Sequence, residues 1–60
     1  MSEYSEWEVA VIQQVADELG ASYSDASGVV AGQPFYMQQS WVKGLDPKQT
    51  AAKILAEAKQ

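Results

Sequence analysis

The side chains in this chain that could do chemistry are carboxylates and hydroxyls. The 60 residues include no cysteine and no histidine, and all four basic residues are lysines. The chain therefore lacks a thiolate nucleophile, a common catalytic triad and a guanidinium clamp for an oxyanion. The carboxylates do not converge either, because sequence neighbours such as Asp17 and Glu18 point about 100° apart on a helix. We expect no enzyme activity and assign no catalytic residue.

Metal and cofactor sites are predicted to be absent for related reasons. Cysteine and histidine are the commonest ligands of zinc, and the chain has neither. Calcium loops need several oxygen ligands at fixed spacing, whereas residues 24–28 contain a single carboxylate, that of Asp25. A chain of 60 residues also has little room for a pocket of a few hundred cubic ångströms, so no small-molecule substrate and no cofactor are expected.

Helix start and stop signals predict the elements that must position these side chains. Ser5 and Glu8 have the spacing of a capping box, and Gly20 is a suitable left-handed helix end. Pro34 and Pro47 each suit the first position of a helix, where the missing N–H would have no partner. Together these signals predict four short helices, at residues 5–19, 23–31, 34–43 and 47–58.

Residues 23–31 have two interpretations. Ser22 and Asp25 repeat the capping spacing, which favours a helix. Gly28 would lie in the interior of that helix, where glycine costs about 1 kcal/mol relative to alanine. The alternative is therefore a loop followed by a short extended segment over residues 28–32.

The apolar pattern predicts one small domain over residues 1–60, an all-α compact bundle of three to four short helices. With 47% hydrophobic residues the chain is not disordered by composition. Its predicted connections are short, which favours neighbouring, roughly antiparallel helices. The predicted core consists of Val9, Ile12, Val15, Leu19, Val30, Met37, Trp41, Leu45, Ile54 and Leu55.

Charge is distributed unevenly along the chain. Residues 1–32 carry six acidic residues and no base, whereas residues 33–60 carry a net charge of +2, which gives −4 for the whole chain. No segment approaches the roughly 18 apolar residues of a membrane span, so no membrane association is expected. The first eight residues, MSEYSEWE, lack the basic region of a secretory signal, and we expect a cytoplasmic protein.

The leading functional hypothesis is a small non-enzymatic protein–protein interaction module, which binds a protein partner or forms a homo-oligomer. Two Trp, three Tyr and one Phe are more than four such short helices can bury. Exposed aromatic residues mark interfaces. The aromatic cluster at residues 35–41 is therefore either core or interface. The candidate interaction residues are Tyr36, Gln38, Trp41, Lys48 and Lys53.

The alternative hypothesis is a helix-turn-helix-like DNA-associated regulator. The segment WVKGLDPKQTAAKIL, residues 41–55, is similar to the opening of many helix-turn-helix domains. The last helix would then read DNA with Lys48, Gln49 and Lys53. The net charge of −4 and the absence of arginine argue against nucleic acid as a partner. A third hypothesis, an acidic first helix that binds a basic protein surface, is supported only by charge.

Overall fold

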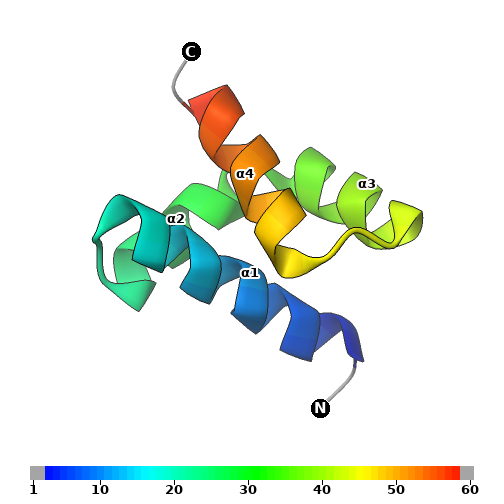
Figure 1. Ribbon diagram of the computed structural model, residues 1–60, viewed down its shortest axis with the longest axis horizontal. Coiled ribbons are helices and arrows are strands. Elements are labelled where there is room, and N and C mark those ends of the chain that lie inside the picture. The colour runs from blue at the N-terminus through cyan, green and yellow to red at the C-terminus, as the bar shows by residue number, and fades with distance from the viewer. Residues whose placement is uncertain (1–2, 59–60) are drawn as a thin grey trace.

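Four α-helices joined by short turns form the computed structural model, which describes residues 3–58 (Figure 1). No strand occurs within that range, so the predicted all-α bundle is confirmed. Residues 23–31 are helical, and the loop alternative for this segment is wrong. The predicted bounds of the last three helices match the observed ones. The helices are α1 Glu3–Leu19, α2 Tyr23–Ala31, α3 Pro34–Lys43 and α4 Pro47–Ala58.

The first helix starts about two residues earlier than predicted, because α1 already includes Glu3. Ser5 lies inside the first turn, so its spacing to Glu8 does not mark the helix start. Two physical effects favour the longer helix. Glu3 and Glu6 lie in the first turn, where the helix dipole favours anions. The ring of Tyr4 also packs against two tryptophans, which fixes the turn that carries it.

The predicted glycine stop at Gly20 is confirmed, and Gly44 ends α3 in the same way. Gly20 has a φ of 65° and Gly44 a φ of 74°, the left-handed conformation that favours glycine. At the end of α3 the N–H of Leu45 donates to the carbonyl oxygen of Ser40 over 3.0 Å. This bond is characteristic of a Schellman motif, and it directs the chain sharply from α3 towards α4.

Two capping pairs are formed, the predicted one at Ser22 and Asp25 and another at Asp46 and Gln49. The N–H of Asp25 donates to Oγ of Ser22 over 3.2 Å at the start of α2. Before α4 the pairing is reciprocal. The N–H of Gln49 donates to Oδ1 of Asp46 over 2.7 Å, and the N–H of Asp46 donates to Oε1 of Gln49 over 3.2 Å. Each pair satisfies N–H groups that have no partner within the helix itself.

Packing is centred on α1, which contacts both α2 and α4, while α3 packs on α4 and more lightly on α2 (Figure 1). Three alanines in the core allow the helices to approach one another closely. None of the described helices is long and apolar enough to cross a membrane. The core consists of Val11, Ile12, Val15, Ala16, Ala26, Val30, Met37, Ala51 and Ile54.

Half of the predicted core residues are buried, namely Ile12, Val15, Val30, Met37 and Ile54. Leu45 and Leu55 are only partly buried. Three predictions are wrong, because Val9 is 44% exposed, Leu19 47% and Trp41 37%.

The reasons for these errors are geometric. The buried stripe of α1 runs through Val11 and Val15, which places Val9 about 160° from Val11 around the helix. Leu19 is the last residue of α1, where the neighbouring helices cover less of its surface.

Two polar side chains lie in the core, and the sequence pattern did not indicate either. Thr50 is fully buried, and its Oγ1 donates to the carbonyl oxygen of Asp46 over 3.0 Å. Ser40 is buried on the inner face of α3, whereas the pattern placed it off the apolar face. Both side chains are small, so they fit where helices approach closely.

We predict that Val15→Ala lowers the free energy of unfolding by about 2 kcal/mol, whereas Val9→Ala changes it far less. Both substitutions remove the same atoms from α1, but Val15 is fully buried and Val9 is exposed. Urea denaturation followed by circular dichroism measures the difference. Equal losses of stability in the two variants would show that the buried stripe of α1 is misplaced.

Candidate interaction surfaces

Helix α3 has two different faces. Its inner face carries Met37 and Ser40, which are buried. On the opposite side Phe35 is 65% exposed and Val42 78%. These two side chains are two turns apart, so they lie on the same side of the helix. We call the outward side the α3 face and define it by Phe35, Gln38, Gln39 and Val42, which line a shallow depression together with Lys43.

Gln38, one of the predicted interaction residues, belongs to the α3 face. The sequence pattern places this polar side chain within an apolar arc, where it is unexpected in a core. The structure explains the arrangement, because Gln38 lies beside Phe35 and Val42 on the exposed side of α3. Gln38 and Gln39 are both exposed and flank the two apolar side chains.

Trp41 takes part in a cluster of three aromatic rings. Its ring centroid lies 5.2 Å from that of Tyr4, edge-on at 89°, and 5.2 Å from that of Trp7 at 57°. The Nε1 group of Trp7 donates to the carbonyl oxygen of Leu45 over 2.9 Å. The cluster joins the start of α1 to the end of α3 and to the turn that follows. Trp41 therefore has a structural role, although its side chain is partly exposed.

Tyr36 is partly buried and packs against the core. Its ring lies 5.7 Å from that of Phe35 at 82°. Desolvation raises the pKa of Tyr36 above its ordinary value of 10.0, and the hydrogen bond that it donates to Glu57, together with the charge of Glu57, raises this pKa further. Tyr36 thus connects α3 to α4, which accounts for a residue that the apolar pattern left unexplained.

Lys48 and Lys53 are both exposed on α4. Because they are five residues apart, they lie about 140° apart around the helix and do not form one basic stripe. Glu57 is also exposed, one turn after Lys53, and reduces the positive charge of that side.

The predicted interaction residues therefore do not form a single site. On α3, Tyr36 faces α4, Gln38 faces outward and Trp41 faces the start of α1. The two lysines lie on α4. Only Gln38 belongs to a surface with exposed apolar side chains on both sides of it.

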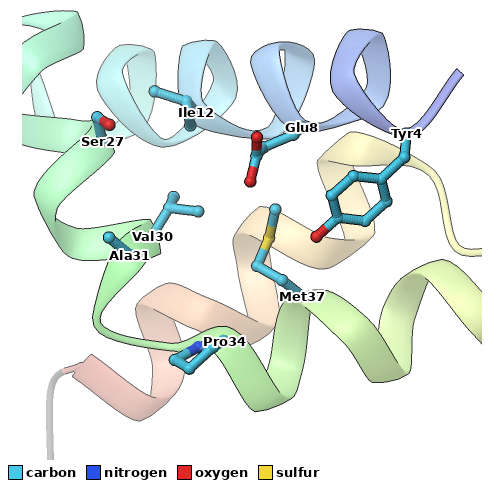
Figure 2. Close-up of a pocket in the computed structure, with 8 residues that line it drawn as sticks. All are labelled: Tyr4, Glu8, Ile12, Ser27, Val30, Ala31, Pro34 and Met37. Carbon is cyan, nitrogen blue, oxygen red and sulfur yellow. The ribbon is translucent and has the colours of Figure 1, made fainter. Parts of the chain in front are cut away.

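A groove of about 200 Å³ between α1, α2 and α3 was not predicted from the sequence. Figure 2 shows Glu8 and Tyr4 pointing into it from α1, towards Met37 of α3. Glu8 is partly buried although it is charged. We call this feature the Glu8 groove, which is lined by Tyr4, Glu8, Ile12, Ser27, Val30, Ala31, Pro34 and Met37.

A signal for this groove is present in the sequence. Glu8 is four residues from both Tyr4 and Ile12, so it lies in the middle of the stripe that α1 turns inward. The interpretation of Glu8 as part of a capping box does not indicate this inward position. Within residues 3–58 the carboxylate of Glu8 has no hydrogen bond and no ion pair.

No three potential metal-binding side chains gather in the described part of the chain. No protein-family model, curated protein or solved structure matches the sequence. The candidate surfaces are therefore judged by their own geometry and charge.

We predict that Tyr36 titrates at higher pH than the ordinary tyrosine pKa of 10.0 and that Glu57→Gln lowers its pKa towards that value. A pKa raised by folding means that the neutral phenol stabilises the folded state below the unfolded pKa, and that this contribution is lost as pH rises through the folded pKa. Phenolate absorbance during alkaline titration measures the effect, and Tyr36→Phe identifies the titration step that belongs to Tyr36. Tyr23→Phe is the control, and this variant should retain the titration step of Tyr36.

Proposed function

We propose that this protein is a non-enzymatic interaction module that binds a helix of a partner protein on the α3 face. The observation that supports this most directly is the exposure of Phe35 and Val42 on the side of α3 opposite the core. Large apolar side chains gathered on one exposed surface are typical of protein interfaces. The inner side of α3 is held by Met37 and Ser40, so the exposed side is presented by a helix that is already packed.

The α3 face favours an amphipathic helix as its occupant. Phe35 and Val42 are about 10 Å apart along the helix axis, the spacing of two apolar anchors in helix-in-groove recognition. Gln38 and Gln39 can donate to and accept from polar groups at the edges of such a helix. Lys43 is the only charged residue that lines the depression. We therefore expect the partner helix to carry an acidic residue at that end.

The absence of cysteine, histidine and arginine supports a non-enzymatic role. A cytoplasmic location is part of the same proposal, and the cysteine-free composition is compatible with it.

We predict that Phe35→Ala combined with Val42→Ala weakens partner binding by about tenfold or more, because both anchors are lost. The matched control is Val9→Ala combined with Leu19→Ala, which removes exposed apolar side chains from α1. A crosslinker placed at residue 38 captures the partner in cells, and calorimetry on the two purified proteins then compares wild type, double variant and control.

Equal affinity of the wild type and the double variant for the purified partner would overturn the proposal. Sedimentation at micromolar to millimolar concentration tests whether a second copy of this chain binds the α3 face instead. A dimer that dissociates in the Phe35→Ala, Val42→Ala variant would assign the α3 face to self-association instead.

The DNA-associated alternative is favoured by one observation, the exposure of Lys48, Gln49 and Lys53 on the last helix. The wide separation of the lysines and the net charge of −4 oppose it. We predict no salt-dependent amide shifts at these three residues when mixed-sequence DNA is titrated at low ionic strength. Shifts confined to them that vanish as salt rises would favour the alternative over the interaction module.

A further inference from the structure

We infer that the Glu8 groove receives the side chain of a lysine from a partner protein. The ammonium group lies beside Glu8 and Tyr4, and the aliphatic stem lies along the apolar wall. None of the residues that line the groove belongs to the α3 face. This inference therefore does not depend on the proposed function, and either can fail without the other.

Glu8 is the residue that points to a cationic ligand. Its carboxylate is partly buried, lies against apolar side chains such as Met37 and Ile12, and has no partner within residues 3–58. Partial burial removes some of the hydration that stabilises a charge, and no protein group described here replaces it. An ammonium group would supply a charge-assisted hydrogen bond at this position.

Tyr4 supplies a second contact for the same cation. Its ring packs against both Trp7 and Trp41, at centroid distances of 5.7 and 5.2 Å. Its hydroxyl points into the groove towards Met37 (Figure 2) and has no hydrogen bond within residues 3–58. The oxygen can accept from an ammonium N–H, and the ring face adds a cation–π attraction where the ammonium lies over it.

The size of the groove and its apolar wall fit one long side chain. A volume of about 200 Å³ is smaller than that of most small-molecule sites. Val30, Ala31 and Pro34 form an apolar wall at the end away from Tyr4. Lysine combines an apolar stem of four carbons with a compact terminal charge, so it matches both parts of the groove.

The surrounding charge favours a cation that comes from another molecule. Residues 1–32 carry six acidic residues and no base, which gives the α1 and α2 side of the groove a negative potential. The lysines in the described part of the chain lie elsewhere, since Lys43 lines the α3 depression and Lys48 and Lys53 are on α4. None of these three lines the Glu8 groove.

The test uses the whole protein and three probes, observed by amide and methionine methyl NMR. The first probe is the tripeptide Ala-Lys-Ala with blocked ends. The second is the same peptide with norleucine in place of lysine, which keeps the stem and removes the ammonium. The third is n-butylammonium chloride, a free amine. Glu8→Gln is compared with Glu6→Gln, which removes the same charge from an exposed position on the same helix.

We expect saturable shifts at Tyr4, Glu8 and Met37 with the lysine peptide, and weakening by about tenfold in Glu8→Gln, because a charge-assisted hydrogen bond is lost. Glu6→Gln should bind the peptide nearly as wild type does.

Four outcomes would overturn the inference. Equal binding of the norleucine peptide would mean that the groove recognises only apolar surface. Equal weakening in Glu6→Gln would mean that only the general negative potential acts. Binding of n-butylammonium without the peptide would assign the groove to a small amine, and the absence of saturable shifts with every probe would mean that it is no binding site.

Discussion

The packing of α1 against both α2 and α4 is the constraint on which the rest of the structure depends. A chain of 60 residues without disulfides can bury only about 60% of the surface exposed by its unfolded form. Four of the nine apolar core residues come from α1 alone, among them the fully buried Val11 and Val15. With α1 at the centre, α3 is covered on one side only. The exposure of Phe35 and Val42 on its other side is a consequence of this arrangement.

The aromatic cluster connects the stability of the fold to the geometry of the Glu8 groove. The hydrogen bond from Trp7 to Leu45 fixes the start of α1 beside the turn between α3 and α4. Trp7 and Trp41 then hold the ring of Tyr4 in place. Since Tyr4 also lines the groove, the contacts that close the bundle determine the shape of one end of that groove. Trp41 therefore contributes to the packing of the bundle while 37% of its surface remains exposed.

The bounds of the last three helices could be predicted from the sequence because their signals are local. The capping pair of Asp46 and Gln49 and the glycine at position 44 act within a few residues, whatever the rest of the chain does. The inner side of α3 could not be predicted in this way. Both sides of the helix carry large apolar residues, and the deciding features were the buried Ser40 and the contact of Tyr36 with Glu57 on another helix. These features depend on how the helices pack together, so a local sequence pattern does not contain them.

Glu8 illustrates how a local signal can conceal a tertiary one. Its spacing from Ser5 matches a capping box, yet the helix starts earlier and Glu8 lies on the inward stripe of α1. A small domain has a free energy of unfolding of only a few kcal/mol, and Glu8 adds no hydrogen bond or ion pair to it within residues 3–58. A leucine at this position would add apolar contacts to the core. Sequences depart from local rules chiefly at functional or strained sites, and within residues 3–58 Glu8 is a charged residue on the inward apolar stripe of α1.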